Sequence, residues 1–106
     1  MAEEREKRGS TKSSSETNEI FIGNKPFMKY VIATIMQLES KDSAIIKARG
    51  KFISRGVDVA EVVKKRVKET REMNLDQELK IGTESFQNEE GKNINVSTID
   101  ITLKKG

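Results

Sequence analysis

Apolar residues along this chain alternate between short runs and stripes at helical spacing. The run Ile20–Ile22 predicts a short strand, and Asn24 and Pro26 after it are typical of a helix start. The stripe that follows predicts a helix ending near residues 39–41. Its members are Met28, Val31, Ile32, Ile35 and Leu38. The pattern therefore begins with a strand and a helix whose apolar side packs inward.

The same strand-then-helix pattern recurs directly afterwards. Ala44–Arg49 predicts a second strand, which Gly50 closes. A second helical stripe follows, and the polar stretch 68–76 predicts the end of that helix and a loop. The stripe consists of Ile53, Val57, Ala60, Val63 and Val67.

The second helix has more apolar surface than one sheet face requires. Val59 and Val62 lie beside the stripe and widen it near Val63. We expect this extra side to pack against a second copy of the chain, which predicts a homodimer through Val59, Val62 and Val63. The alternative is that the helix buries all of this surface against its own sheet.

The last thirty residues predict a long β-hairpin whose register follows from its turn. Gly91 suits the left-handed position of a three-residue loop, Glu89–Gly91, which would pair Asn88 with Lys92. This register places apolar residues opposite one another. The pairs are Ile81 with Ile99, Leu79 with Ile101, and Phe86 with Ile94.

Apolar residues change sides partway along this hairpin. They occupy odd positions near its base and even positions near its tip, and the change falls at 83–85 in one strand and at 97–98 in the other. A β-bulge or a strong twist would explain the change. We expect the base to pack on the domain and the tip to leave it as an arm about 20 Å long.

These elements define the expected architecture. The fold class is α/β, a two-layer sandwich in the order β-α-β-α-β-β, with a mixed four-stranded sheet, both helices on one face and a long C-terminal β-hairpin arm. Residues 1–18 contain almost nothing to bury and predict a disordered tail rich in serine and charge, so the domain spans 19–106. No run is long enough to span a bilayer, and no signal-peptide pattern is present. We expect a soluble, intracellular protein.

Positive charge is concentrated in one part of the sequence. The net charge is +3, and the segment 20–57 alone has seven basic and two acidic residues, a net of +5. The basic residues are Lys25, Lys29, Lys41, Lys47, Arg49, Lys51 and Arg55. Clustered positive charge on a small domain favours a polyanionic partner such as nucleic acid. A second basic run, 64–68, lies between acids and indicates a solvated helix face.

Composition excludes several kinds of chemistry. The chain has no cysteine and no histidine, which excludes disulfides, thiolate or imidazole catalysis and ordinary zinc sites. It contains no recognisable nucleophile–base pair, phosphate-binding loop or cluster of metal ligands. We therefore expect neither an enzyme nor a bound metal or cofactor.

Three motifs resemble those of the Alba family, a group of small dimeric nucleic-acid-binding proteins known as archaeal chromatin proteins and also found in eukaryotes. The first motif is Ile22–Val31, the second comprises Ile46–Lys51 and Ile53–Asp58, and the third is Asn95–Ile99. They occur in the family's order and spacing across residues 19–104.

The resemblance implies a dimer built around the second helix. It also implies a duplex-binding mode in which a basic dimer face meets the backbone while two hairpin arms follow the minor groove. By position, the phosphate contacts are Lys25, Arg49, Lys51 and Arg55, and the arm contributes Lys92, Asn93 and Asn95. Four cations on each subunit would neutralise about eight phosphates, which predicts a slope of log affinity against log salt of about −7.

The chain departs from the family pattern in two places. The family usually has a lysine pair before the proline, and the first lysine is acetylated. Asn24 stands at that position, so Lys25 is the remaining modification candidate. The arm contains Glu84, Glu89 and Glu90 but one basic residue, Lys92, and the carboxylates oppose its insertion beside phosphates. We expect the contacts of the body to outweigh those of the arm.

The expected function is non-sequence-specific binding of double-stranded DNA as an architectural chromatin protein. The location would be the archaeal cytoplasm or nucleoid or, in a eukaryote, the nucleus or cytoplasm. The alternative is RNA binding, as in Alba-like ribonuclease P subunits or translation-associated proteins, because backbone contacts serve both nucleic acids. A protein-interaction scaffold is a third possibility. It requires that substitution of Arg49 and Lys51 leave nucleic-acid binding unchanged.

Overall fold

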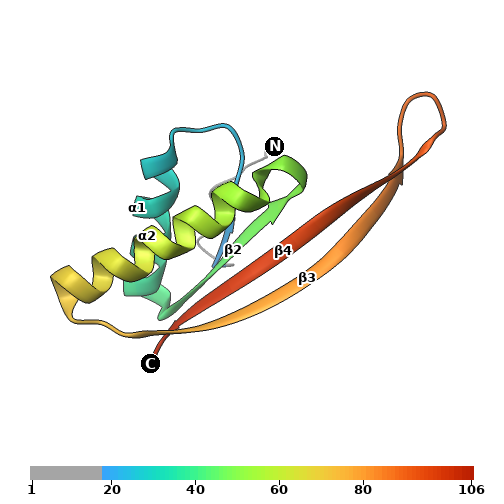
Figure 1. Cartoon of the computed structure of the whole chain (residues 1–106). Helices are drawn as coiled ribbons and strands as arrows, with labels where there is room; N and C mark the ends of the chain where they lie inside the picture. Colours follow the sequence, from blue (N-terminus) through green and yellow to red (C-terminus); the bar gives the residue numbers. More distant parts are fainter. Residues whose placement is uncertain (1–17) are drawn as a thin grey trace, which may run out of the picture.

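Two helices lie on one face of a four-stranded sheet, in the order that the sequence predicts (Figure 1). The computed structural model describes residues 18–106, and the predicted tail, apart from Asn18, lies outside the described residues. The elements are β1 Glu19–Phe21, α1 Phe27–Lys41, β2 Ser43–Arg49, the 3-10 turn η2 Gly50–Phe52, α2 Ile53–Arg71, β3 Leu75–Gln87 and β4 Asn93–Lys105.

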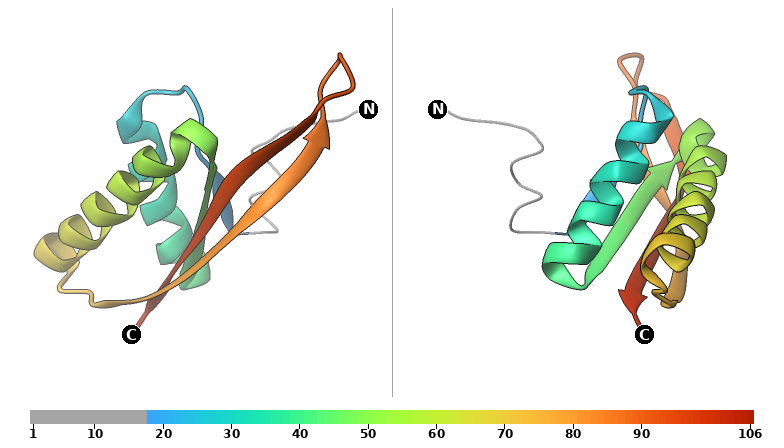
Figure 2. Two further views of the ribbon diagram at one scale, coloured as in Figure 1. Left: turned by 45° about the vertical axis from the view of Figure 1, so that its right-hand side comes forward. Right: turned by 90° about the vertical axis from the view of Figure 1, so that its left-hand side faces the viewer.

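The sheet is mixed, as expected. Its strand order is β1-β2-β4-β3, with β1 parallel to β2 and the other two pairs antiparallel. Both helices cover the same face, as the right-hand view of Figure 2 shows. The predicted α/β sandwich is therefore confirmed, and the long hairpin of β3 and β4 extends beyond the helices (Figures 1 and 2).

The core lies between the sheet and the helices. The register of β2 and β4 pairs Ile46 with Ile101, so alternate residues of both strands face the helices. The buried strand residues are Ala44, Ile46, Ala48, Ile99, Ile101 and Leu103. The helices contribute Val31, Leu38, Val59, Ala60, Val63 and Val67. These side chains form one apolar layer that fixes both helices against the central strands.

Helix α1 buries part of the predicted stripe but not all of it. Val31 and Leu38 are fully buried as expected, but Met28 and Ile32 are exposed, at 38% and 52%. Tyr30 and Thr34 are buried instead, and the Thr34 hydroxyl donates a 2.7 Å hydrogen bond to the Tyr30 carbonyl. A hydroxyl that is bonded within its own helix costs little to bury, and hydrophobic spacing alone does not detect it.

The start of α1 also differs from the prediction. The helix begins at Phe27 after Pro26, and no side chain caps it, so Asn24 is not a helix cap. The Lys29 amide donates to the Pro26 carbonyl at 3.0 Å. Asn24 belongs instead to a loop that is bound to the first turns of the two helices.

Helix α2 uses both of its apolar sides within its own chain. Val59 and Val63 are fully buried, so the prediction that they face a second copy is wrong. The physical reason is that α2 packs against α1 as well as against the sheet (Figure 2). Val62 lies partly buried at the edge of this core.

The polar stretch 68–76 contains the end of α2 and the loop to β3, as the sequence predicts. Helix α2 continues to Arg71, and residues 72–74 lead directly to Leu75, where β3 begins. Glu72 ends the helix with φ 51°, in the left-handed region.

The predicted register of the C-terminal hairpin is confirmed. Gly91 has φ 84°, and the Asn88 amide donates to the Lys92 carbonyl at 2.9 Å. The pairs are Leu79 with Ile101, Ile81 with Ile99, and Phe86 with Ile94. Pairing continues without interruption from Leu75 to Gln87, so the hairpin has no bulge. The ribbons twist around each other toward the tip, which accounts for the change of sides (Figure 1).

At the base of the hairpin β4 packs on the domain as expected, but two apolar residues of β3 do not. Leu79 and Ile81 are 59% and 78% exposed, although their partners Ile101 and Ile99 are buried. The reason is that β3 is an edge strand, whereas α2 lies over β2 and β4. The sheet therefore leaves an uncovered apolar strip beside its core.

Candidate nucleic-acid interface

The loop between β1 and α1 is organised by the side chain of Tyr30. The Tyr30 hydroxyl accepts hydrogen bonds from the amides of Gly23 and Lys25, both at 2.9 Å. Tyr30 itself is only 6% exposed. Because a buried hydroxyl fixes two amides of the loop, the Lys25 side chain projects to solvent from a defined backbone.

Arg55, in the first turn of α2, contacts the same loop. Its Nη2 atom donates a 2.6 Å hydrogen bond to the Lys25 carbonyl. Its guanidinium carbon lies 5.8 Å from the ring centroids of both Phe27 and Tyr30. These distances are within the range of a cation–π interaction.

A tight turn after β2 presents two more cations. Gly50 has φ 59°, and a Cβ built there would lie 3.4 Å from Val96 Cγ1. A side chain at this position would be strained and crowded, so glycine is favoured. The turn exposes Arg49 and Lys51, and the Lys51 ammonium lies 5.4 Å from the Phe52 ring.

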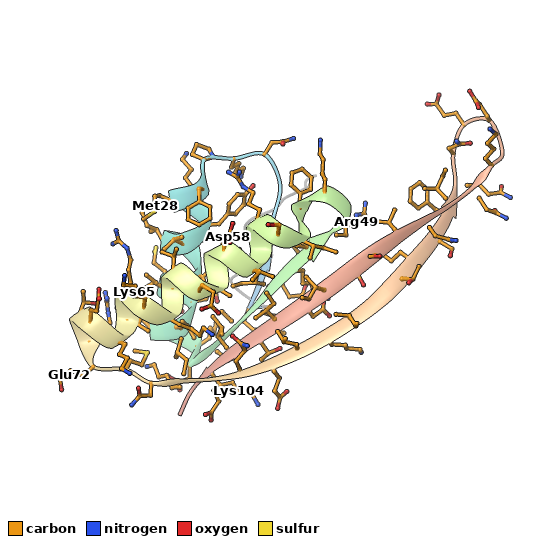
Figure 3. The ribbon with its side chains drawn as sticks, in the orientation of Figure 1. Met28, Arg49, Asp58, Lys65, Glu72 and Lys104 are labelled. Carbon is orange, nitrogen blue, oxygen red and sulfur yellow. The ribbon has the colours of Figure 1, made fainter. Side chains whose placement is uncertain are left out.

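These four cations lie at one end of the molecule. The β1–α1 loop and η2 occupy the end where α2 begins, and the hairpin arm projects beyond the same end (Figure 1). Arg49 is near the base of the arm, whereas Lys65 and Lys104 lie toward the opposite end (Figure 3). The predicted body residues Lys25, Arg49, Lys51 and Arg55 are thus brought together.

Arg49 has an acidic neighbour on the arm. Its Nη1 atom lies 2.5 Å from Glu84 Oε1, and the two side chains are 63% and 54% exposed. Lys25, Lys51 and Arg55 have no ion-pair partner among residues 18–106. The pair reduces the free positive charge at the base of the arm, because Glu84 neutralises Arg49 in part.

The predicted arm residues lie away from this cluster. Lys92 is in the turn, where its amide donates to the Asn88 side-chain oxygen at 3.0 Å, and Asn93 follows at the start of β4. The Asn95 side chain accepts a 2.7 Å hydrogen bond from the Ser85 hydroxyl. The Asn88 side chain therefore stabilises the turn rather than facing a ligand.

Lys47, another member of the basic segment, does not join the cluster. It lies on the open face of the sheet, 3.6 Å from Glu19 and 3.5 Å from Asp100. A groove of about 520 Å³ on this side is lined by Phe21, Lys47, Arg49, Glu84, Thr98 and Asp100, among others. The two ion pairs of Lys47 offset its charge on this face, where Arg49 is likewise paired with Glu84.

Sequence reasoning missed two residues of the site, Tyr30 and Glu84. Tyr30 lies within the first motif, but nothing in the spacing marks its hydroxyl as an acceptor for loop amides. Glu84 was recognised as acidic but not as a partner of Arg49. The pairing could be found only by combining two registers. Arg49 of β2 pairs with Thr98 of β4, and Thr98 pairs with Gly82 of β3, which is two residues from Glu84.

Residues 18–106 contain no group of three acidic side chains placed to hold a metal ion. In the same part of the chain, neither helix is long and apolar enough to cross a membrane.

Known proteins resemble this chain over most of its length. The Alba family model matches residues 18–75. The DNA/RNA-binding protein Alba of Methanococcus maripaludis is 49% identical over 90 residues, which cover 83% of this chain and 98% of the relative. The protein of the same name from Methanocella arvoryzae is 47% identical over 91 residues, which cover 85% of this chain and 92% of the relative. These names describe nucleic-acid binding and no catalytic activity.

Solved structures agree with these sequence relatives. Alba from Thermoplasma volcanium matches with a TM-score of 0.70 and 43% identity, and the match covers 82% of this chain and 99% of that one. ALBA1 from Trypanosoma brucei shares the fold, with a TM-score of 0.56 and 22% identity. The match covers 84% of this chain and 69% of that one. With the family model matching more than half of the chain and relatives close to 50% identical, this protein belongs to the Alba family.

Proposed function

We propose that this protein binds double-stranded DNA without sequence specificity, as an architectural chromatin protein. The observation that supports this most strongly is the gathering of Lys25, Arg49, Lys51 and Arg55 at one end of the molecule. The archaeal relatives named DNA/RNA-binding proteins support the class of ligand. Binding through phosphates requires clustered cations and little else, because phosphate contacts contain no sequence information.

In this proposal three side chains on each subunit contact phosphates. Lys25, Arg49 and Lys51 are exposed and can turn toward a ligand, whereas the Arg55 guanidinium is already bound to the Lys25 carbonyl. A dimer would therefore neutralise about six phosphates through its body, which corresponds to a salt slope of about −5. Lys25 also remains the modification candidate, because acetylation would remove one of these charges.

We propose that the protein is a homodimer, with an interface revised from the sequence prediction. Val57 is 39% exposed, and Leu79 and Ile81 form the uncovered strip beside the core. A second copy that covers this strip would bury apolar surface that the single chain leaves in water. Val62, partly buried at the edge of the same helix, would adjoin this interface.

The arm is proposed as a secondary contact that reaches along the minor groove through Lys92, Asn93 and Asn95. Its asparagines suit the degenerate hydrogen-bonding pattern of that groove. Glu89 and Glu90 lie in the turn beside Lys92 and repel phosphates. The arm is therefore expected to add less affinity than the body.

Structured RNA is the second candidate ligand, and the names of the relatives, which mention both nucleic acids, favour testing it directly. The experiment is a competition between duplex DNA and structured RNA of equal length at fixed salt. An architectural DNA role predicts that DNA competes at least as well as RNA. Preference for RNA by tenfold or more would replace this role with RNA binding. If the protein binds neither DNA nor RNA, and Arg49→Ala and Lys51→Ala do not change this result, a role as a protein-interaction scaffold would be favoured.

The archaeal relatives also support a cytoplasmic or nucleoid location. Residues 1–18 are proposed as a tail outside the binding domain, because they contain equal numbers of acidic and basic residues and almost no apolar side chains.

A further inference from the structure

We infer that Arg55 is a positioning residue rather than a phosphate ligand. It fixes Lys25 relative to the turn Arg49–Lys51, and Tyr30 completes this arrangement. The inference rests on the proposed function, because it concerns how the proposed phosphate contacts are held in place. It revises the role that the family resemblance implies for Arg55.

The guanidinium of Arg55 is fixed on several sides. Its Nη2 donates to the Lys25 carbonyl at 2.6 Å, and its carbon lies 5.8 Å from the centres of the Phe27 and Tyr30 rings. Its Nε is closed off from solvent and has no hydrogen-bond partner among residues 18–106. A side chain arranged in this way is not a freely solvated cation that can turn toward a passing phosphate.

Both backbone polar groups of Lys25, the N–H and the carbonyl, form hydrogen bonds. Its N–H donates to the Tyr30 hydroxyl at 2.9 Å, and its carbonyl accepts from Arg55 at 2.6 Å. The neighbouring Gly23 amide donates to the same hydroxyl. One tyrosine and one arginine therefore determine where the Lys25 side chain leaves the surface.

This contact links two separate segments of the proposed interface. Arg55 lies in the first turn of α2, directly after the turn that presents Arg49 and Lys51, whereas Lys25 belongs to the β1–α1 loop. Cations held at fixed spacing bind adjacent phosphates without the entropy cost of ordering a loop during binding. Lysine cannot replace Arg55 here, because it lacks the planar group that both stacks on rings and donates at a fixed angle.

The test compares three variants, of which only one changes the charge. Arg55→Lys retains the charge but loses the planar group, Arg55→Ala loses both, and Tyr30→Phe removes only the hydroxyl. Arg66→Lys, an exposed arginine on the same helix, is the matched control. Affinity for a DNA duplex is measured across a salt series for each, and circular dichroism verifies folding.

A positioning role predicts that Arg55→Lys and Arg55→Ala lose affinity to a similar extent, about tenfold. Their salt slopes should become shallower by about 2, the value for losing Lys25 from both subunits. Tyr30→Phe should also lower the affinity and make the salt slope shallower. Arg66→Lys should have the affinity and the salt slope of the wild type. In a Lys25→Ala background, Arg55→Lys should have no further effect, because Arg55 acts through Lys25.

Wild-type binding by Arg55→Lys, with loss only in Arg55→Ala, would overturn the inference and identify Arg55 as a direct ligand. If Tyr30→Phe does not fold, the comparison of the two Arg55 variants still decides between these roles.

A second readout requires no nucleic acid. Hydrogen exchange at the Gly23 and Lys25 amides of the free protein should be about tenfold faster in Arg55→Lys and in Tyr30→Phe than in the wild type. Unchanged exchange in both variants would refute the positioning network even if the protein binds DNA. Conversely, a wild type that binds no nucleic acid would refute the proposed function, while the exchange data would still report on the network.

Discussion

Arg49 has two competing partners, a phosphate of the proposed ligand and the carboxylate of Glu84. The ion pair is 2.5 Å long, but both side chains are more than half exposed. Exposed pairs of this kind stabilise a protein by about 1 kcal/mol or less, so a phosphate can displace Glu84 at modest cost. The sequence predicts Arg49 as a binding residue. It could not identify Glu84 as its competitor, because that requires the registers of β2 against β4 and of β4 against β3.

Glu84→Gln should therefore strengthen binding. The substitution frees Arg49 and removes a negative charge near the proposed phosphate path, and we expect DNA affinity to rise about two- to fivefold at low salt. Fluorescence anisotropy with a labelled duplex measures the change. Glu78→Gln, an exposed carboxylate on the same strand, is the control and should have a smaller effect. Equal affinity of Glu84→Gln and the wild type would show that the pair does not restrain Arg49.

At the level of elements, the sequence predicted which segments are helices and strands better than it predicted their faces. The order of elements and the hairpin register followed from apolar spacing and from one glycine, Gly91, because both are local properties. The buried side of α1 followed from this spacing only in part, because Thr34 and Tyr30 are buried through hydrogen bonds. The burial of two sides of α2 could not be predicted from apolar spacing either, because it depends on where α1 lies.

The first turn of α2 packs closely on β2, and Gly56 permits this contact. A Cβ on Gly56 would lie 2.9 Å from the Ala48 Cβ. Glycine-to-alanine changes in helices normally stabilise by about 1 kcal/mol, but here we expect Gly56→Ala to destabilise by about 1–3 kcal/mol because backbone segments must separate. Urea denaturation measures this, with Ser54→Ala in the same turn as the control. A Gly56→Ala protein as stable as the wild type would contradict the packing described here.

The arm should contribute little to affinity despite its length. If Lys92 bound a phosphate in both subunits, Lys92→Ala would make the salt slope shallower by about 2. We expect a smaller change, because Glu89 and Glu90 adjoin Lys92 in the turn. Replacing both glutamates by glutamine should increase affinity more than Lys92→Ala reduces it. The opposite ranking would indicate that the arm binds phosphates as strongly as the body.

The whole molecule is elongated, with extents of 51, 32 and 22 Å, and its apolar surface is incompletely covered. The sequence predicted a second copy from Val59 and Val63, but the structure buries both within one chain. The uncovered residues Leu79 and Ile81 lie on a strand that sequence reasoning expected to pack inward. Surplus apolar surface could be recognised from composition and spacing, but its location depends on which strands the helices cover.

Ile81→Asp should prevent dimer formation without unfolding the chain, because this side chain is 78% exposed in the single subunit. Sedimentation velocity should give a monomer, and the salt slope should decrease from about −5 to about −3 because half of the cations are lost. Phe21→Asp, an equally drastic change at an exposed apolar residue on the open face of the sheet, should leave the assembly intact. A dimer that persists in Ile81→Asp would place the interface elsewhere.

In the proposed function, cations gathered at one end of each subunit bind phosphates together. The most direct test is the salt dependence of duplex binding by the wild type and by the triple variant Lys25→Ala, Arg49→Ala and Lys51→Ala. We expect a wild-type slope of about −5 and a slope between zero and about −2 for the triple variant, in which only the arm can still contact phosphates. A wild-type slope between zero and about −2, or a triple variant that keeps the wild-type slope, would contradict the proposed function.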